Sequence, residues 1–315
     1  MVMEPRAPLV SINIPCYHNL AQARRCVDSV LGQTFGDFVL TLFDDGASDE
    51  YRDYVLALGD PRVRYHRNPS RLGSMRNMFQ TIVAGSGTYT LAFHEDDLLG
   101  RHFLATAVGV LEAHPSCGFV AAELREFTAE PSAAQLATVP GDPAFDLFAS
   151  PADFVRAILG GSEPMFGSVV YRREALAGVA AEHDAYGTLA DRPFLLAITA
   201  RWSAAVLRDP LAWYRHHPDD ARHQGMHADH IVRLFTLYRS FLSRPLSPAD
   251  QALFYRHSGY WLFTLYDLTP DQQRPPFGRF LFRVWAAGLY QARWRGRFGL
   301  RLLQRALLGH RRAAS

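Results

Sequence analysis

The chain has 315 residues, of which 48% are hydrophobic and 20% are charged, and its formal net charge is +2. This composition is ordinary for a globular protein with a sizeable core in one large domain or two smaller ones. The three cysteines, Cys16, Cys26 and Cys117, have no metal-binding spacing and fit a reducing compartment. Neither a secretory signal pattern nor a run of about 20 apolar residues occurs, so we expect a cytoplasmic protein without a transmembrane helix.

Strand and helix patterns alternate over the first 125 residues. The first predicted helix starts after the capping residue Asn19 and ends at Gly32. The second follows Ser48 or Asp49, either of which can cap it. Strands are expected at 9–14, 38–43, 63–66, 89–93 and 118–122, and further helices at 75–83 and 103–113. This alternation predicts an α/β fold with a mainly parallel sheet.

The second half of the chain is less regular. Residues 128–150 are rich in Pro, Ala, Gly and Asp and are predicted to form a loop. Periodic patterns resume at 154–159 and 168–171, and a helix is expected from about 193 to 200. Beyond Asp229 the pattern is helical and aromatic-rich, without strands. We therefore expect an α/β domain at 1–222 and a helical region at 223–315.

Two acidic clusters follow two of the predicted strands. Asp44-Asp45-Gly46 follows the strand at 38–43, and His94-Glu95-Asp96-Asp97 follows the strand at 89–93. In open α/β sheets, ligands bind at the carboxyl ends of the strands. Adjacent carboxylates repel each other, and a divalent cation is the usual compensation. The pattern predicts a site for a metal ion and a phosphate-bearing ligand.

A set of motifs carries a family resemblance. They are Val10–Asn19, Leu31–Phe35, Phe43–Asp49, Arg67-Asn68, Gly73 with Asn77, and the tetrad His94–Asp97. In this order and spacing they resemble the family 2 inverting glycosyltransferases with the GT-A fold. The resemblance covers residues 8–125 well and 150–218 loosely. It implies a nucleotide-sugar donor, a Mn²⁺ or Mg²⁺ cofactor and a carboxylate that acts as base.

Donor binding is assigned to the strand ends. Tyr17 is expected to stack on the base, and Asp45, with Asp44, to accept hydrogen bonds from base or ribose. Asp96 is expected to bind the metal that screens the diphosphate. Alternatively, Asp44–Gly46 is only a turn, Tyr17 a wall residue, and Asp97 a cap for the next helix. The full donor-binding set is Pro15, Tyr17, Asp44, Asp45, Arg71, Gly73, Asn77, Glu95 and Asp96.

The metal ligands depend on the geometry of the tetrad. The commonest family pattern has an Asp where this chain has His94. In an extended strand, His94 and Asp96 share one face and Glu95 and Asp97 share the other. We therefore predict His94 and Asp96 as ligands, with Glu95 and Asp97 as the alternative pair, and an imidazole ligand favours Mn²⁺. The resemblance of Trp213–His217 to a family segment adds His217 as a ligand and Arg215 as a phosphate partner.

The catalytic base is expected from the second half of the chain. An inverting transfer needs a carboxylate to remove the proton of the acceptor hydroxyl. The segment Leu189–Phe194 resembles the family position of this base and predicts Asp191, although the acidic residue usual before it is Ala190 here. Asp191 is alternatively a helix N-cap before Pro193. Within Gly160–Phe166, we assign Glu163 and Met165 to the acceptor, with Glu163 as a second candidate base.

The C-terminal stretch is strongly basic. No acidic residue follows Asp271, whereas ten arginines do, and they alternate with aromatic residues between Phe277 and Leu308. Such a pattern suits the headgroup region of an anionic membrane, so residues 277–312 are predicted to make a peripheral membrane contact. The alternative is a helix packed on the catalytic domain with its arginines in solvent. Nucleic acid is not an expected partner, because no recognition module accompanies the arginines.

These expectations define a function and its rivals. We predict an inverting, metal-dependent transfer of a sugar from a nucleotide-diphosphate donor to a hydroxyl of a glycan or lipid-linked acceptor in bacterial surface polysaccharide biosynthesis. The protein is expected in the cytoplasm, at the inner face of the plasma membrane. The rivals are a sugar-phosphate nucleotidyltransferase and a non-catalytic protein that binds nucleotide or glycan. A dinucleotide oxidoreductase is disfavoured, because the first strand lacks a following Gly-x-Gly-x-x-Gly motif.

Overall fold

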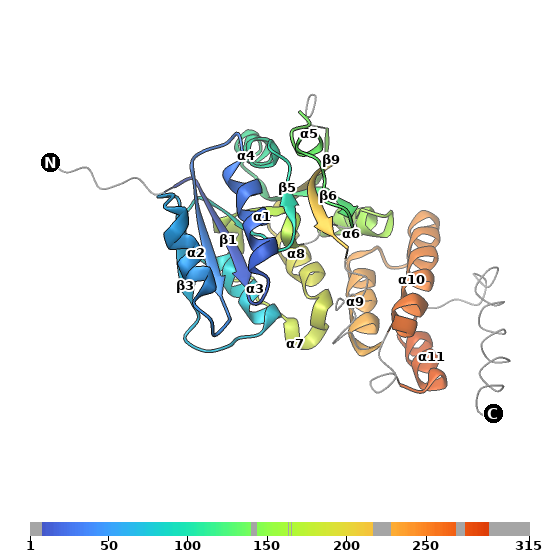
Figure 1. The fold of residues 1–315 in the computed structure, drawn as a ribbon. Helices are drawn as coiled ribbons and strands as arrows, with labels where there is room; N and C mark the ends of the chain where they lie inside the picture. The colour runs from blue at the N-terminus through green and yellow to red at the C-terminus, as the bar shows by residue number, and fades with distance from the viewer. Residues whose placement is uncertain are drawn as a thin grey trace. The chain divides into compact units, whose positions relative to one another are not determined.

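The structure is a computed structural model, and it describes residues 8–139, 144–162, 164, 166–216, 228–268 and 275–289. The chain forms two compact units. The sheet unit comprises residues 1–154, 162–183 and 190–221, and the helical unit comprises 155–161, 184–189 and 222–315. Figure 1 shows the order of the helices and strands along the chain.

The sheet unit is built on one large sheet. Its strands have the order β3-β2-β1-β4-β8-β6-β9-β5, and β7 pairs with β9 outside this path. The strands β3, β2, β1 and β4 are parallel neighbours, whereas β8 is antiparallel to both β4 and β6. The bounds are β1 Val10–Cys16, β2 Phe38–Asp44, β3 Val63–Arg67, β4 Tyr89–Ala92, β5 Leu98–Leu99, β6 Cys117–Phe127, β7 Phe145–Phe148, β8 Val169–Arg172 and β9 Ser203–Arg215.

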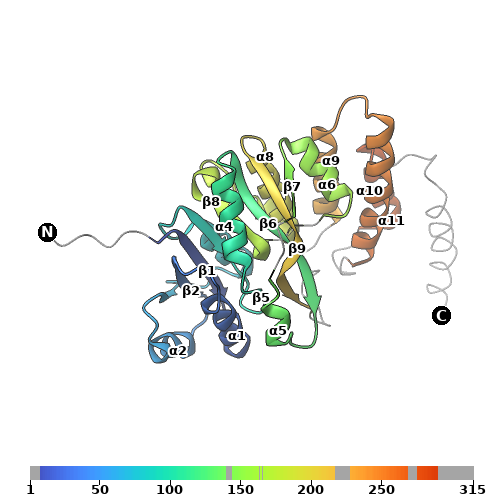
Figure 2. The ribbon, with the colours of Figure 1, turned by 90° about the horizontal axis from the view of Figure 1, so that it is seen from above.

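Helices cover both faces of this sheet (Figures 1 and 2). Val10, Ile12 and Ile14 of β1 share one core with α1 (Leu20–Leu31), α2 (Glu50–Leu58) and α4 (Phe103–Ala113). On the other face, the side-chain amide of Asn13 donates to two carbonyls, Thr81 O and Ala84 O, at the end of α3 (Ser74–Val83). Because both faces are covered, β1 is buried almost throughout, as expected for a central parallel strand.

Shorter elements complete the sheet unit and lead into the helical unit. They are α5 (Ala133–Leu136), α6 (Pro151–Leu159), α7 (His183–Tyr186), α8 (Asp191–Thr199) and the 3₁₀ turns η1 (Phe166–Ser168), η2 (Arg173–Leu176) and η3 (Gly187–Leu189). Asn19 caps α1 as predicted, because its side chain accepts a hydrogen bond from the Gln22 N–H.

The helical unit consists mainly of α9 (Ala228–Phe241), α10 (Pro248–Leu268) and α11 (Phe277–Ala286). Aromatic rings form its core, and the ring centres of Phe235 and Phe254 lie 6.3 Å apart. Within this unit, the Nε of Arg156 donates to Oδ1 of Asp250 at 2.8 Å, which joins α6 to α10. Among the described residues, helices with the length and hydropathy needed to span a bilayer are absent.

The predicted α/β class with a helical C-terminal region is confirmed, but two local expectations were wrong. The predicted loop at 128–150 contains α5 and the strand β7, which pairs antiparallel with β9. The long strand β9 itself was not predicted, although residues 204–207 form a short apolar run.

Candidate functional site

The loops after β1, β2 and β4 meet at the carboxyl edge of the sheet. The Asp45 N–H donates to Cys16 O at 2.9 Å, and the Tyr17 N–H donates to Oε1 of Glu95 at 3.2 Å. These two contacts tie the first loop to both of its neighbours. The three segments that the sequence analysis singled out are therefore adjacent in space, at the edge where ligands bind in open α/β sheets.

The carboxylate of Asp45 organises the loop that precedes α3. Its Oδ1 accepts from the side-chain amide of Asn68 at 2.9 Å and from the Leu72 N–H at 2.8 Å. Its Oδ2 accepts from the Gly73 N–H at 2.8 Å, and Gly73 has a left-handed backbone with φ of +83°. Only 6% of Asp45 is exposed. These bonds hold residues 68–73 against the end of β2.

Asp44 is more deeply buried, with a side chain that is 0% exposed. Its Oδ1 accepts from the Gly46 N–H at 2.8 Å, and its Oδ2 accepts from the Tyr65 hydroxyl at 2.7 Å. In this structure the carboxylate has no surface for a ligand, so the predicted contact of Asp44 with base or ribose is corrected to a positioning role. The alternative of a simple turn does not describe Asp44 fully either, because the hydrogen bond from Tyr65 joins β2 to β3.

Residues around Tyr17 form the more open part of the strand ends. The guanidinium carbon of Arg71 lies 4.3 Å from the centre of the Tyr17 ring, within range of a cation–π interaction. Pro15 is half-buried and lies opposite Phe43 in the β1–β2 pairing. Asn77, by contrast, is 2% exposed, and its amide donates to Phe43 O at 3.1 Å. Tyr17 and Arg71 are thus accessible, whereas Asn77 supports β2 from within.

Glu95 points away from the rest of the acidic tetrad. Its Oε1 accepts from the Tyr17 N–H, and its Oε2 accepts from the hydroxyl of Tyr51 in α2. Burial raises the pKa of Glu95 to about 7, opposed by these hydrogen bonds and assisted by the charges of Asp96 and Asp44. Glu95 therefore braces the loop after β1 against α2.

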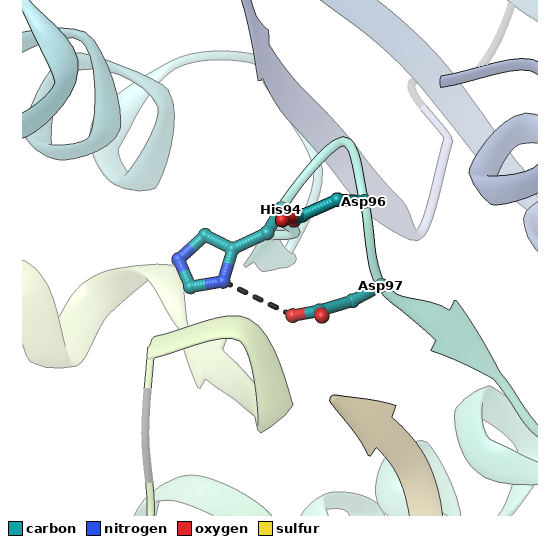
Figure 3. Close-up of side chains that lie close together, drawn as sticks. All are labelled: His94, Asp96 and Asp97. Carbon is teal, nitrogen blue, oxygen red and sulfur yellow. Dashed lines mark hydrogen bonds and ion pairs between the residues drawn. The ribbon is translucent and has the colours of Figure 1, made fainter. Parts of the chain in front are cut away.

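His94, Asp96 and Asp97 form a compact cluster that could hold a cation (Figure 3). One ligand atom from each side chain lies within 4.8 Å of the others, and Nδ1 of His94 is 3.1 Å from Oδ2 of Asp97. The prediction that Asp97 faces away from His94 was wrong, because a turn at Glu95-Asp96 replaces the extended strand. Of the alternative pair, Asp97 belongs to this cluster, whereas Glu95 bonds with Tyr17 and Tyr51. Two carboxylates and an imidazole suit a divalent cation such as Mn²⁺.

The electrostatics of the cluster follow from its burial and charges. Burial alone would lower the pKa of His94, but the hydrogen bond and charge of Asp97, with the charges of Asp96 and Asp191, raise it overall. Burial raises the pKa of Asp97, and the contact with His94 opposes that rise. A cation would therefore meet a concentrated negative potential here.

The end of β9 fixes the acidic loop in place. The Arg215 N–H donates to Oδ1 of Asp97 at 2.9 Å, and its Nε donates to the carbonyl of Asp96 at 3.0 Å. The same guanidinium forms an ion pair with Glu130 and is 11% exposed. Arg215 thus positions the acidic loop, and its predicted phosphate contact stays a prediction. Asp97 does not cap the next helix, because α4 begins after His102.

A close approach of η1 completes the surroundings of the cluster. A Cβ atom on Gly167 would lie 3.2 Å from Nδ1 of His94 and 3.3 Å from Oδ2 of Asp97. Such contacts are tighter than ordinary van der Waals packing, so a larger side chain here would have to displace the pair. The backbone at Gly167 can approach His94 and Asp97 because it carries no side chain.

Asp191 lies near the cluster although it comes from the second half of the chain. It is the first residue of α8, with Ala190 in the N-cap position, and its Oδ1 accepts from the Arg192 N–H at 2.9 Å. It is 6% exposed, and its charge raises the pKa of both His94 and Tyr171. The alternative N-cap role is therefore not observed. Glu163, Met165 and His217 lie outside the described residues.

Some supporting residues were not found from the sequence. Asp97 was predicted only as a helix cap or as half of the alternative ligand pair with Glu95, and Tyr51 and Glu130 had no predicted role at the site. Asp97 could have been found if the strand had been ended at Ala92, since a turn brings residues three apart together. Tyr51 and Glu130 carry no local signal, because each acts on a partner that is distant in sequence.

The parallel strands, the helices on both faces and the acidic cluster after β4 define a protein of the GT-A class. Residues 11–148 match the family model described as Glycosyl transferase family 2. This part of the chain, which lies within the sheet unit, is therefore similar to the family 2 glycosyltransferases.

Known proteins resemble the chain in sequence and in structure. The PGL/p-HBAD biosynthesis glycosyltransferase of Mycobacterium bovis (strain BCG) is 36% identical over 97 residues, which are 30% of this chain and 37% of that protein. Crystalline S. aureus TarS 1-349 with UDP-GlcNAc has a TM-score of 0.54 and 11% identity, covering 89% of each chain. The mannosyltransferase PcManGT from Pyrobaculum calidifontis with GDP-Man and Mn²⁺ has a TM-score of 0.52 and 16% identity, covering 96% of this chain and 81% of that one.

The sequence matches are local. The chain spans 37% to 38% of the length of the mycobacterial relatives and 33% of a relative from Escherichia coli. At the identities of the two solved structures, the likeness shows the fold alone.

Proposed function

We propose that the protein is an inverting glycosyltransferase that moves a sugar from a nucleotide-diphosphate donor to a hydroxyl of a glycan or glycolipid acceptor. The observation that carries this proposal is the cluster of His94, Asp96 and Asp97 at the carboxyl edge of the sheet, with Asp191 close enough for its charge to raise the pKa of His94. A candidate base and a candidate cation site are thereby combined at the ligand-binding edge of a GT-A sheet. Solved relatives of the same fold with UDP-GlcNAc, or with GDP-Man and Mn²⁺, support a donor of this class.

The donor would be bound by the loops after β1, β2 and β4. Tyr17, with Arg71 against its ring, would stack on the base, while Asp45 and Gly73 shape the loop that faces it. His94, Asp96 and Asp97, with His217, would hold Mn²⁺ or Mg²⁺. A divalent ion bound there would neutralise the diphosphate and stabilise it as the leaving group.

Asp191 would act as the general base. Its carboxylate would take the proton from the acceptor hydroxyl while the hydroxyl oxygen attacks the anomeric carbon on the side opposite the diphosphate, which inverts the configuration. The rings of Phe79, Phe166 and Phe194 pack together beside α8, with the Phe166 and Phe194 centres 5.7 Å apart. This apolar packing would limit water near Asp191 and so favour sugar transfer over hydrolysis.

The names of the relatives and the basic C-terminal stretch support the proposed acceptor and location. The name of the mycobacterial relative refers to PGL/p-HBAD biosynthesis, which supports an acceptor in glycolipid or surface polysaccharide synthesis. We assign Glu163 and Met165 to the acceptor, residues 1–222 to the catalytic domain and 223–315 to a helical region. A lipid-linked acceptor would place the protein at the cytoplasmic face of the membrane, in contact through 277–312.

A screen of nucleoside diphosphates by thermal shift, with and without Mn²⁺, tests donor binding. Ligands that bind only the folded state raise the melting temperature, by an amount that grows with ligand concentration over Kd. We expect a Mn²⁺-dependent rise that Asp96→Ala abolishes. The control Asp146→Ala should keep the rise, because it removes a carboxylate that is 45% exposed on β7. An undiminished rise in Asp96→Ala would refute the metal assignment.

Product analysis then tests the reaction itself. Release of nucleoside diphosphate from a nucleotide sugar supports sugar transfer, and an α-linked donor that yields a β-linked product supports inversion. Release of pyrophosphate would instead identify a nucleotidyltransferase. If the protein binds donors but turns none of them over, a binding protein is the correct conclusion.

A further inference from the structure

The helix α11 has one face that anchors it within the helical unit. Phe280 is 1% exposed and Val284 is 0% exposed. The ring of Phe280 stacks on Tyr266 of α10 with the ring centres 4.5 Å apart and the planes 28° apart. Leu289, after the helix, is also buried, at 1%. The position and rotation of α11 on α10 are therefore determined by packing.

The opposite face of α11 presents two large aromatic side chains to solvent. Phe282 and Trp285 are each 64% exposed, and their ring centres lie 6.1 Å apart. In the part of the chain that the structure describes, the other exposed large hydrophobic side chains are aliphatic: Leu56, Val83, Val139 and Leu147. An aromatic pair left in water forgoes the favourable burial of its apolar area, so its exposure calls for an explanation.

Positive charge accompanies the aromatic pair. Arg279 is exposed on the same helix, and Arg283, with 47% of its side chain exposed, forms an ion pair with Asp229 of α9. The sequence after Asp271 contains ten arginines and no acidic residue. Any partner of this region therefore meets a surface that is both aromatic and cationic.

We propose that the face of α11 formed by Arg279, Phe282, Arg283 and Trp285, the α11 face, docks on an anionic lipid bilayer. Phenylalanine and tryptophan rings partition to the boundary between headgroups and acyl chains, and arginines beside them attract anionic headgroups. Charge complementarity favours an anionic bilayer over a second copy of the chain, because two copies of the cationic α11 face would repel each other.

The proposed function explains why the protein would bind a membrane, and the inference rests on it only in that respect. A lipid-linked acceptor gives the enzyme a reason to lie on a membrane, but attachment of the α11 face to lipid is measured separately from catalysis. The experiments below can therefore fail for one proposal and succeed for the other.

Co-sedimentation of the full-length chain with lipid vesicles tests the docking. We expect binding to phosphatidylcholine vesicles that contain phosphatidylglycerol, weaker binding to pure phosphatidylcholine, and a decrease as NaCl is raised. The double variant Phe282→Ser/Trp285→Ser should bind at least tenfold more weakly. The matched control Leu56→Ser/Val83→Ser removes side chains that are 71% and 57% exposed on the sheet unit, and it should bind as the wild type does.

A charge variant and two further measurements complete the test. Arg279→Glu should weaken binding to anionic vesicles and leave binding to neutral vesicles unchanged. Undiminished vesicle binding by the double aromatic variant overturns the proposal. So does light scattering that shows a wild-type dimer and a monomeric double variant, because the face would then join two copies. With a water-soluble acceptor and no vesicles, the wild type and the double aromatic variant should release nucleoside diphosphate at the same rate. If neither protein releases it, that result counts only against the proposed transferase activity.

Discussion

The backbone N–H of Arg215 donates a hydrogen bond of 2.9 Å to Oδ1 of Asp97, across 118 residues of sequence. The Nε of Arg215 holds the carbonyl of the neighbouring Asp96 at 3.0 Å. One residue at the end of β9 thus fixes both the backbone and a carboxylate of the candidate cation site. Partners of metal ligands often matter nearly as much as the ligands themselves, because they set the orientation of the ligands.

Replacing Arg215 by lysine should therefore weaken metal binding. Lysine keeps the charge but cannot reproduce the guanidinium contacts with Asp96 and Glu130, so the acidic loop should become less ordered. We expect the Kd for Mn²⁺, measured by isothermal titration calorimetry, to rise roughly tenfold or more. The control is Arg125→Lys, because the guanidinium carbon of Arg125 lies 4.9 Å from the Trp213 ring centre, much as that of Arg215 lies 4.6 Å from the Phe127 ring centre on the same pair of strands. Equal Mn²⁺ affinities in the two variants would contradict the positioning role of Arg215.

Removal of the base should separate catalysis from donor binding. Asp191→Asn preserves shape but cannot accept a proton at neutral pH, so kcat for nucleoside diphosphate release should fall about 10²–10⁴-fold. The Mn²⁺-dependent thermal shift with nucleotide should remain. Glu174→Gln, at an exposed position in η2, is the control and should keep full turnover. Wild-type turnover in Asp191→Asn would transfer the role of base to another group, with Glu163 the next to be tested.

A glycine at the edge of the sheet should be needed for nucleotide binding. A Cβ atom on Gly46 would lie 2.9 Å from the carbonyl oxygen of Tyr17 and 3.0 Å from Oδ1 of Asp44. Gly46→Ala should therefore push apart the loops after β1 and β2 at a cost of about 1–3 kcal/mol, and nucleoside diphosphate affinity by calorimetry should fall about tenfold. No atom lies within 4 Å of a Cβ on Gly36, so Gly36→Ala should bind normally. Normal binding by Gly46→Ala would show that these loops tolerate displacement.

The ion pair between Arg156 and Asp250 should make the stability of the helical unit depend on pH. The hydrogen bond from Arg156 lowers the pKa of Asp250 below 3.8, while burial opposes it. A depressed pKa stabilises the fold above the pKa of the unfolded chain, and this contribution is lost as pH falls through the folded-state value. Arg156→Met should therefore cost about 1–2 kcal/mol at pH 7, allowing for an arginine that is 40% exposed.

Thermal unfolding of wild type and variant at several pH values measures this effect. The difference between them should shrink steadily as pH falls below about 4. The matched control Arg208→Met removes a pair whose side chains are 61% and 45% exposed, and it should change stability by less than about 1 kcal/mol. A difference that stays constant from pH 7 to pH 3 would mean that the Arg156 contribution is packing and not charge.

Much of the fold could be predicted from local pattern. The alternation of apolar strands and amphipathic helices over residues 1–125 reflects periodicities that each segment carries by itself. Asn19 and Gly32, the residues that begin and end α1, act within one turn of the chain and were predicted correctly. The strand β9 was not predicted because Arg208, Asp209 and Pro210 interrupt its apolar pattern, and because its pairing with β6 and β7 is non-local.

The sequence by itself determined that acidic residues end neighbouring strands of an α/β sheet, because strand length and the order of the motifs are local properties. Only the tertiary structure decided what each acid does there. Asp44 is buried and does not reach a ligand, and Glu95 accepts a hydrogen bond from Tyr51. A turn places Asp97 beside His94, where it also accepts a hydrogen bond from Arg215. The roles of these acidic residues depend mainly on hydrogen-bond partners that lie far away in the sequence. Packing of the whole sheet unit brings these partners close, and no single segment does so by itself.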